Sequence, residues 1–425
     1  MDRMPLVDQF PYQFTRPRVV PHWTFLGRLG NRLWLLPRAG KVAALDIQGV
    51  EHLRPLLDRD DGILIAPNHS DNADAAVLFE ASRRIGRPFT YLAAFQIFRG
   101  PARFLLPRVG AFPVDREGAD IRAFKAGVEI LSGGRNPLVV FPEGEIYHVS
   151  DRLTPLREGA VAFATTAAKR LARSGKTVWI VPAGLKYRFL EGHDPTPALV
   201  ALMGRLEARF TWLPRPDRSL VERIYRYAEG LLALKELEIL GECKSGPLKG
   251  RIAALRDAIL DRIEGHRACR RRDDPVPVRI KELRRACLEA LREPGIAADR
   301  VADLQRDLND LFVAVQLFSY PGDYVREQPT LERIAETLVK FEQDTLGARI
   351  APPRGPRRAT LRLGEPIDVG GRLADHARPR DAIGAITAEL EGRIQSLLDE
   401  IGPGRTIADR PEVNRPREGG PPGGP

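Results

Sequence analysis

The chain has 425 residues, of which 43% are hydrophobic and 29% are charged, and its formal net charge is +10. This composition is that of a globular protein with enough apolar material for a buried core, which excludes disorder of the whole chain. The three cysteines are too few and too scattered for a disulfide framework or a Cys-x-x-Cys metal clamp, which favours a reducing compartment.

The N-terminal segment, residues 1–43, is basic and amphipathic. Residues 1–44 hold seven Lys or Arg against two Asp, and such an excess favours an anionic surface, either phospholipid headgroups or nucleic acid. A helix is predicted that ends at Pro37, with Arg28 and Arg32 opposite an apolar stripe. The stripe consists of Trp23, Leu26, Leu29, Leu33 and Leu36. This helix could lie in a membrane interface or pack on the main domain. No apolar run approaches the ~18 residues that span a bilayer, and the start lacks the apolar stretch of an export signal, so we expect neither a span nor export.

From residue 44 to about 190, strand-length apolar runs alternate with helix-length segments. The buried strands are predicted at 62–67, 89–95, 110–114, 136–142 and 177–185. Helices are predicted at 120–133 and 157–173, where apolar residues recur every three or four positions or alanine dominates. Such alternation is typical of βαβ units, so we predict a mainly parallel sheet covered on both faces.

After Leu190 the pattern changes to consecutive amphipathic helices without strand character. They are predicted at 198–210, 219–240, 247–266, 277–292, 299–319 and 330–346. Ser219 and Glu222 form the capping-box pattern that opens the second of these helices. Strand character returns at 359–369, before a helix at about 380–400.

A sheet that is interrupted by a helical block and then resumes indicates an insertion into one domain. We therefore predict an α/β fold with a mainly parallel sheet flanked by helices and a large all-helical insertion. The expected divisions are a basic amphipathic segment at 1–43, the α/β core at 44–190, the insertion at 191–356, the return of the core at 357–401 and a disordered Gly/Pro-rich tail at 402–425.

The segment APNHSDNAD, at the end of the first buried strand, is the strongest candidate for chemistry. Open α/β sheets bind ligands beyond the carboxyl ends of their strands. Pro67 is expected to stop the strand, and Ser70 or Asp71 to cap the following helix. His69 and Asp74 can meet only if His69 precedes that helix and Asp74 lies in its first turns. A carboxylate on one imidazole nitrogen leaves the other as a general base near neutral pH.

No nucleophile of the protein accompanies His69. The chain has no Gly-x-Ser-x-Gly elbow, and its cysteines all lie in the predicted helical insertion. His69 would therefore activate a hydroxyl or a water that belongs to the substrate.

Two further segments follow strand ends. In VVFPEGEIY, Glu143 can bind a substrate hydroxyl or a cation, and Gly144 lets the backbone approach a ligand closely. In GAFPVDR, Arg116 can hold a phosphate or carboxylate bidentately. The alternative interpretations are a plain solvated turn for the first segment and a surface salt bridge to Asp115 or Glu117 for the second.

In this order, these segments resemble the motifs of the glycerolipid acyltransferase family, also called PlsC-like, which includes lysophosphatidic acid acyltransferases. The first family motif, Asn-His-x4-Asp, is matched by Asn68, His69 and Asp74. The second, Gly-x-(aromatic or aliphatic)-x-(aliphatic)-x-Arg, is matched by Gly110, Phe112, Val114 and Arg116.

The third and fourth motifs are also present. Phe-Pro-Glu-Gly is matched by residues 141–144, and an aliphatic strand ending in Val-Pro-(small) is matched by Val181, Pro182 and Ala183. The later Leu-Arg-Leu-Gly-Glu-Pro-Ile at 361–367 is similar to the strand that closes the family's domain. The resemblance covers about 44–190 and 357–400.

The resemblance implies that His69 deprotonates the free hydroxyl of an acceptor, which attacks the thioester of an acyl-CoA or acyl carrier protein, while Asp74 orients the ring. It implies that Arg116 holds the acceptor's phosphate and that Glu143 and Gly144 shape the acceptor pocket. The remaining positions expected to bind substrate are Asn68, Gly110 and Pro182. It implies no metal and no cofactor besides the acyl donor as co-substrate, and 1-acylglycerol-3-phosphate is the first acceptor expected.

One departure concerns the third motif, which the family usually continues as Thr-Arg-Ser. Glu145, Ile146 and Tyr147 stand there instead, so the expected phosphate-binding arginine at 146 is missing. A carboxylate near a phosphate dianion costs binding energy unless it is paired or protonated. The acceptor could then be a different lysolipid, an ornithine-type lipid or a larger polar alcohol. Alternatively, the lost charge is replaced by Arg152, Arg157 or Lys186.

The leading hypothesis is an O-acyltransferase in the cytoplasm, bound peripherally to the inner face of an anionic membrane, with a lysolipid acceptor and no nucleic acid partner. A metal-dependent hydrolase with the ligands His69, Asp71, Asp74 and Glu143 is a second hypothesis, although a single histidine argues against zinc. A non-catalytic lipid-binding protein is the third. The apolar run at 311–318 could cover the acyl chain or touch the membrane, but we expect it to be the insertion's own core.

Overall fold

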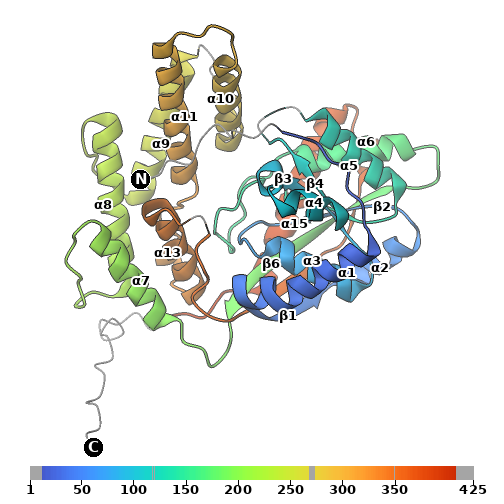
Figure 1. Ribbon diagram of the computed structural model, residues 1–425, viewed down its shortest axis with the longest axis horizontal. Coiled ribbons are helices and arrows are strands. Elements are labelled where there is room, and N and C mark those ends of the chain that lie inside the picture. The colour runs from blue at the N-terminus through green and yellow to red at the C-terminus, as the bar shows by residue number, and fades with distance from the viewer. Residues whose placement is uncertain (1–11, 117, 119, 268–272, 349, 408–425) are drawn as a thin grey trace, which may run out of the picture.

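The computed structural model describes residues 12–116, 118, 120–267, 273–348 and 350–407. Figure 1 shows an α/β core with a bundle of helices beside it. The strands are β1 (Val42–Gln48), β2 (Gly62–Pro67), β3 (Thr90–Ala94), β4 (Ala111–Val114), β5 (Leu138–Val139), β6 (Val178–Phe189), β7 (Arg357–Leu363) and β8 (Ile367–Asp368). They form one sheet in the order β1-β7-β6-β2-β5-β3-β4, with β8 paired to β6. Among these pairings only those of β6 with β7 and β8 are antiparallel, which confirms the predicted mainly parallel sheet.

Helices cover both faces of this sheet. On the core they are α1 (Pro21–Gly30), the π-helix η1 (Asn31–Ala39), α2 (Val50–Asp58), α3 (Asp74–Ile85), the 3₁₀ turn η2 (Phe95–Ile97), α4 (Pro101–Arg108), α5 (Ile121–Gly133), α6 (Gly159–Leu171), α14 (Val369–Ala374) and α15 (Pro379–Ile401). The side chains of successive β2 residues point to opposite faces of the sheet. Leu64 and Ala66 pack with α5, α6 and α15, whereas Ile63 and Ile65 pack with η1, α2 and α3. All of β2 is buried, which is why its sequence is one continuous apolar run.

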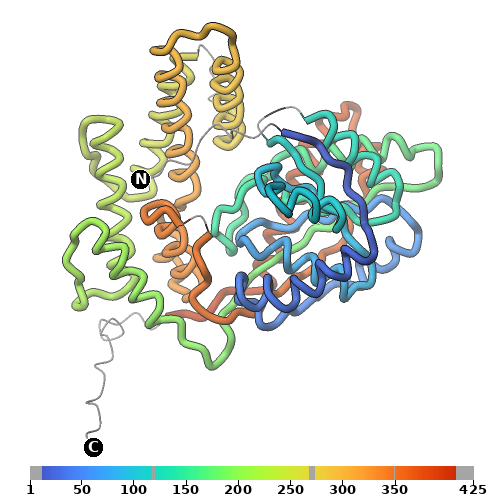
Figure 2. The backbone as a smooth tube through the Cα atoms, viewed as in Figure 1, coloured from blue at the N-terminus to red at the C-terminus, as the bar shows by residue number. Residues whose placement is uncertain are grey.

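The remaining helices lie between β6 and β7 in the chain. They are α7 (Thr196–Arg209), α8 (Leu220–Leu240), α9 (Leu248–His266), α10 (Val276–Leu291), α11 (Ala298–Phe318), α12 (Tyr324–Glu327) and α13 (Leu331–Leu346). Figure 2 shows the chain leaving the core, building this bundle and returning. The bundle has two apolar clusters, one of which contains Leu311, Ala314 and Leu317, so part of the run at 311–318 serves the insertion's own core. The capping box of Ser219 and Glu222 is formed as predicted.

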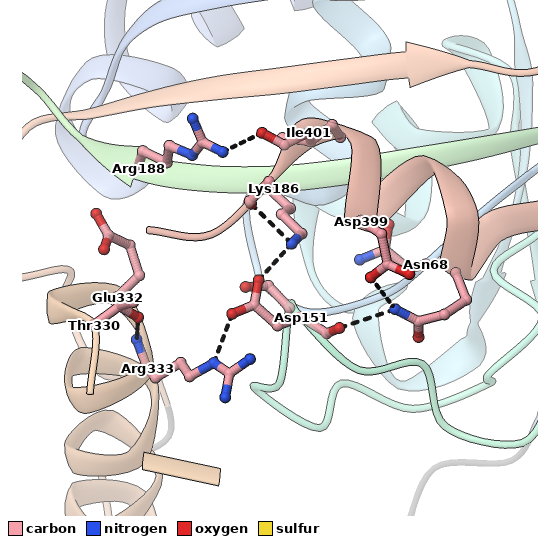
Figure 3. A network of polar contacts seen from close by, with 12 residues as sticks. Asn68, Asp151, Lys186, Arg188, Thr330, Glu332, Arg333, Asp399 and Ile401 are labelled. Atoms are coloured by element: carbon pink, nitrogen blue, oxygen red, sulfur yellow. Dashed lines mark hydrogen bonds and ion pairs between the residues drawn. The ribbon is translucent and has the colours of Figure 1, made fainter. Parts of the chain in front are cut away.

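A buried ionic cluster joins the insertion to the core (Figure 3). Asp151, in the loop between β5 and α6, accepts hydrogen bonds from Lys186 of β6 and from Arg333 of α13, the latter at 2.7 Å from Nε. Next to it, Ser150 donates from its hydroxyl to Glu336 of α13. The side chains of Asp151, Lys186 and Arg333 are less than a tenth exposed. The loop that follows the third motif therefore connects the insertion to the core through these buried polar contacts.

The N-terminal segment packs on the core through α1 and η1. Gly27 lies against α3 and the residue that follows α4: an added Cβ would be 3.2 Å from Val109 Cγ1 and 3.5 Å from the Phe79 ring. The prediction that Pro37 ends the helix is wrong, because Pro37 lies inside η1. The amide of Gly40 donates to the carbonyl of Leu35 at 2.8 Å, so the last turn closes around the proline.

Two further features differ from the prediction. The strand β1 went unpredicted because its sequence VAALDIQ is no continuous apolar run and it lies, only partly buried, at the edge of the sheet. The tail was expected to be disordered from 402, yet Leu331 donates to the Arg405 carbonyl at 2.8 Å and Ile407 is buried. The rest of that predicted tail, 408–425, lies outside the described residues. Within the described ranges no helix has both the length and the apolarity to cross a bilayer.

Candidate active site

His69 and Asp74 meet at the carboxyl end of β2. His69 lies in the turn after Pro67, the last residue of β2, and Asp74 is the first residue of α3. The ring Nδ1 of His69 lies 2.8 Å from Oδ2 of Asp74. The Asp74 side chain is fully buried, whereas 19% of the His69 side chain is exposed. The strand-to-helix turn thus pairs one ring nitrogen with the carboxylate and leaves Nε2 for a substrate.

The Asp74 carboxylate is held from several sides. Its Oδ2 also accepts from the backbone amides of Ser70 at 2.9 Å and Asp71 at 3.0 Å. Its Oδ1 accepts from the hydroxyl of Tyr187 on β6 at 2.7 Å. Burial raises the pKa of Asp74, although the hydrogen bond with His69 acts in the opposite direction. The expected cap by Ser70 or Asp71 is wrong, because α3 starts only at Asp74 with Ala73 as its N-cap.

Asp71 forms an ion pair with Arg357, the first residue of β7; the side chains are 20% and 10% exposed. The distances are 2.6 Å from Nη1 to Oδ2 and 3.3 Å from Nη2 to Oδ1. The guanidinium also donates to the Gly40 carbonyl at 2.7 Å and lies over the Tyr187 ring, 4.5 Å from its centroid. Burial acts to raise the pKa of Asp71, but the charge of Arg357 lowers it overall. The returning strand therefore braces the turn that carries His69.

Glu143 ties the third motif to the first. Its Oε1 accepts from the backbone amide of His69 at 2.6 Å, and its Oε2 accepts from the backbone amide of Thr154 at 3.1 Å and from the Thr154 hydroxyl. Burial raises the pKa of Glu143 to about 7, against the opposing effect of these hydrogen bonds. Phe141 stacks on the His69 ring with centroids 4.0 Å apart. Both residues fix the position of the imidazole.

Arg116 and Gly144 also come together. The Arg116 Nη1 donates to the Gly144 carbonyl and lies 3.1 Å from Oε2 of Glu145. Gly144 has φ +78°, and a Cβ there would lie 2.7 Å from Nε of Arg157, so glycine is required at this turn. Arg116 thus forms a salt bridge with Glu145, and Glu117, one of the two neighbours that the alternative interpretation named, lies outside the described residues.

The other predicted substrate-binding residues occupy different settings. Both polar atoms of the buried Asn68 amide bond to the backbone of Leu185, at 2.7 and 3.0 Å, so Asn68 locks the end of β2 to β6. Gly110 has φ +96° and packs against the Phe89 carbonyl before β4. Pro182 lines a cleft with β7 and α15 that contains none of the other predicted site residues. Contact of these three with a substrate stays a prediction.

The four side chains considered as metal ligands are already engaged in bonds within the protein. Asp71 pairs with Arg357, Asp74 with His69 and Tyr187, and Glu143 with backbone amides. In the part of the chain that the structure describes, no group of three or more His, Cys, Asp or Glu side chains could hold a metal ion.

Sequence reasoning missed Tyr187 and Arg357, because their contacts with Asp74 and Asp71 span 113 and 286 positions. A signal existed for Tyr187, a hydroxyl near the end of a long and mostly apolar run, because buried polar groups need a partner. No comparable signal existed for Arg357, one of many arginines in its neighbourhood.

Comparison with known proteins agrees with this geometry. No curated protein matches the chain. Residues 44–193, which contain His69, Asp74, Arg116 and Glu143, match the family model described as Acyltransferase. The mainly parallel, helix-flanked sheet fits that fold. Residues 44–193 therefore form an acyltransferase-family domain, in line with the resemblance to the PlsC-like glycerolipid acyltransferases.

Proposed function

We propose that the protein transfers a fatty acyl group from the thioester of acyl-CoA or an acyl carrier protein to the free hydroxyl of a lysophospholipid-type acceptor. The observation that carries this proposal is the bond between Nδ1 of His69 and the buried carboxylate of Asp74. This bond fixes the tautomer that carries its proton on Nδ1, so Nε2 has a free lone pair. Nε2 then accepts the proton of the acceptor hydroxyl as the oxygen attacks the thioester carbonyl.

The surrounding residues keep this base in place during the reaction. Tyr187 and two backbone amides hold the Asp74 carboxylate, and Glu143 and Phe141 hold the backbone and ring of His69. Such pre-organisation matters because general-base help is worth about 10²–10⁴ in rate only when the base lies within hydrogen-bond reach of the proton. The same imidazolium returns its proton to the departing thiolate, so the donor leaves as a free thiol.

An exposed apolar surface formed by the N-terminal helices and by the segment before β4 supports the proposal that the protein docks on a membrane. It joins α1 and η1 to η2 and α4, which meet where Trp23 contacts Phe104 edge to face at 5.4 Å. Its large apolar side chains are 40% to 67% exposed. They are Phe25, Leu26, Leu29, Leu33, Trp34, Leu35, Ile97, Phe104 and Leu105. A patch of this kind marks an interaction site, not an ordinary solvated face.

The charge around this patch favours an anionic membrane. Residues 12–40 and 95–110 contain eight arginines and no Asp or Glu. Arginines beside partly exposed Trp and Phe suit the headgroup level of a bilayer, where anionic lipids add to the apolar binding energy. We therefore propose that α1, η1 and α4 hold the enzyme on the membrane that supplies its lysolipid, with the inner face of the membrane as its place of action.

Flotation with vesicles tests the docking surface. Vesicles of phosphatidylcholine with about a third phosphatidylglycerol should carry the wild type upward and release it at high salt, since screening weakens the arginine contribution. Trp34→Glu should lose most of this binding. Leu213→Glu, a change at a 79% exposed leucine in the insertion, serves as the matched control. Equal flotation of the Trp34 variant and the control would contradict the proposed role of this surface in membrane docking.

Acceptor-dependent thiol release tests the chemistry. Purified protein is given palmitoyl-CoA or palmitoyl carrier protein with and without a lysolipid, and free thiol and acylated product are measured together. The proposal expects one thiol released for each ester formed and little release without acceptor. Bound lipid with neither thiol nor ester formed would instead support the non-catalytic alternative.

A further inference from the structure

The π-helix η1 connects the proposed docking surface to the catalytic domain. Of its nine residues only Asn31 and Leu36 are buried, whereas the apolar side chains of residues 33–35 are 44% to 58% exposed. It packs on α3, the helix that begins at Asp74, and leads directly into β1. One short segment therefore presents apolar side chains for a membrane and also contacts the helix that carries the catalytic carboxylate.

The chain is strained where η1 joins β1. Pro37 lies inside η1, and π-helical bonding is an uncommon arrangement that is frequent at functional sites. Lys41 has φ +46°, a left-handed conformation that costs free energy for any residue with a side chain. A strained junction and few buried side chains are features of a segment with low local stability in water. A membrane that covers residues 33–35 would therefore favour the folded form of η1.

The end of η1 touches the catalytic turn at Gly40. An added Cβ would lie 3.1 Å from the Cβ of Ala73, the N-cap of α3, and 3.2 Å from the Leu36 carbonyl oxygen, so the two backbones approach closely. The amide of Ala73 in turn donates to Oδ1 of Asp71 at 2.8 Å. A shift of the chain at Gly40 would therefore disturb the turn that leads into Asp74.

Arg357 makes a second connection between the same two segments. Its guanidinium donates to the Gly40 carbonyl at 2.7 Å and to Oδ2 of Asp71 at 2.6 Å. The amide of Asp71 donates to Oδ2 of Asp74 at 3.0 Å, and this is the oxygen that is paired with the imidazole. A continuous chain of bonds thus runs from the end of η1 through Arg357 to the carboxylate that orients the imidazole.

We propose that Arg357 is a positioning residue that couples membrane contact to catalysis. On an anionic membrane η1 is held in its folded form, the Gly40 carbonyl fixes one side of the guanidinium, and Arg357 keeps the turn that carries His69 in place. Away from the membrane η1 loosens, the guanidinium loses this acceptor, and the imidazole is correctly placed for a smaller fraction of the time. The membrane then raises turnover itself, beyond concentrating a lysolipid. The proposal rests on the proposed acyl transfer and docking surface and extends both.

Stimulation by vesicles that contain no substrate tests this coupling. A short-chain lysolipid and octanoyl-CoA are used below the concentrations at which they aggregate, so that the membrane is not needed to supply them. Vesicles of phosphatidylcholine with about a third phosphatidylglycerol should raise the wild-type kcat at least about fivefold with little change in either KM, a typical size for coupling between two sites. The rise should saturate at the lipid concentration that carries the protein upward in flotation.

The first pair of variants tests Arg357 at saturating vesicles. Arg357→Lys keeps the charge but loses the planar fork that bonds Gly40 and Asp71 together. The ratio of kcat with vesicles to kcat without them should fall to near one. Arg358→Lys, at the neighbouring exposed position of β7, should keep the wild-type ratio. Because the ratio compares each variant with itself, a smaller fraction of folded protein does not change it.

The second pair tests the contact at the end of η1. Gly40→Ala places a methyl group against Ala73 and should lower the ratio, although Gly40 has φ −85° and its backbone suits alanine. Gly30→Ala lies at the other end of the same segment, where an added Cβ meets nothing within 4 Å, and should keep the wild-type ratio. Both variants retain the apolar side chains of the docking surface, so flotation should show equal binding.

Hydrogen exchange measures the coupling without turnover. Vesicles should slow amide exchange in residues 31–41 of the wild type and also in residues 68–74, which form the catalytic turn. In Arg357→Lys only the first of these segments should remain protected. Vesicles of phosphatidylcholine alone, which bind more weakly for lack of anionic lipid, should protect both segments less.

The outcomes separate this proposal from the proposed function. Slower exchange at 31–41 without any change at 68–74, or a kcat that fully bound vesicles leave unchanged, overturns the coupling, while acyl transfer by the wild type leaves the proposed function standing. Equal stimulation of Arg357→Lys and Arg358→Lys overturns the role of Arg357. Protection of both segments that depends on Arg357, without acyl transfer to any acceptor, overturns the proposed function and keeps the connection between η1 and the turn.

Discussion

Tyr187 donates its hydroxyl hydrogen to Oδ1 of Asp74 at 2.7 Å, while His69 bonds the other carboxylate oxygen at 2.8 Å. A chain of hydrogen bonds thus runs from Tyr187 on β6 through Asp74 at the start of α3 to the imidazole of His69. Burial raises the pKa of Tyr187 far above its ordinary value, so the hydroxyl keeps its proton and remains a donor at any working pH.

Replacing Tyr187 with Phe should lower kcat about tenfold with little change in KM. The variant leaves Oδ1 of Asp74 without a donor, and the loss of such a bond costs about 1–2 kcal/mol of positioning. Steady-state kinetics of Tyr187→Phe and of Tyr227→Phe, whose hydroxyl bonds Thr345 in the insertion, provide the comparison. A raised KM with an unchanged kcat in the Tyr187 variant would contradict a positioning role.

The ion pair of Asp71 and Arg357 should behave as a coupled unit. Arg357→Met leaves a carboxylate that is only 20% exposed without its partner, so urea unfolding should show a loss of about 2 kcal/mol or more. Asp71→Asn in the same chain should recover a large part of that loss, because no uncompensated charge remains. Single changes that add up without any coupling would show that the pair does not act as a unit.

Glu143 gives the stability a specific pH dependence. Its pKa rises from 4.5 to about 7 in the folded chain. Between these pH values the folded chain holds a proton that the unfolded chain has released, so the free energy of unfolding decreases as pH rises. The shift corresponds to about 3 kcal/mol, fully lost above pH 7.

Denaturant unfolding from pH 4 to 8 measures this contribution. Glu143→Gln cannot titrate, so the difference in stability between wild type and variant should shrink or reverse as pH rises through this window. Glu158→Gln, at an exposed position before α6, should run parallel to the wild type. A parallel curve for the Glu143 variant too would mean that its carboxyl titrates normally.

Asp151 should be essential for keeping the insertion on the core. Asp151→Asn leaves the buried Lys186 and Arg333 without their shared counter-charge, and we expect a loss of about 3 kcal/mol or more in the free energy of unfolding. Limited proteolysis should then cut earlier around α13. Asp217→Asn, which breaks an exposed pair with Arg215, should have no measurable effect. Equal stability of the two variants would show that the cluster does not anchor the insertion.

Sequence reasoning was most successful where the physical signal is local. The run GILIAP predicts β2 residue for residue because a strand buried on both faces needs apolar side chains throughout. The helices of the insertion follow from their periodicity and from the Gly and Pro between them. The edge strand β1 was not predicted, because its partly exposed positions do not require a continuous run of apolar residues.

The site was predictable only in part for the same reason. His69 and Asp74 lie within one turn, so their spacing and the strand end suffice to bring them together. The contacts of Arg357 with Asp71 and of Arg157 with Gly144 depend on how the chain returns after the insertion and on a loop without regular structure. Local pattern carries no information about such tertiary contacts.

The rate of acyl transfer by His69→Ala tests the central claim most directly. With the acceptor and donor that give the highest wild-type turnover, kcat should fall by about 10²–10⁴, with KM and the unfolding temperature unchanged. His266→Ala, at a 57% exposed side chain in the insertion, should retain full activity. A His69→Ala enzyme that turns over within a few-fold of the wild type would show that this imidazole is not the base.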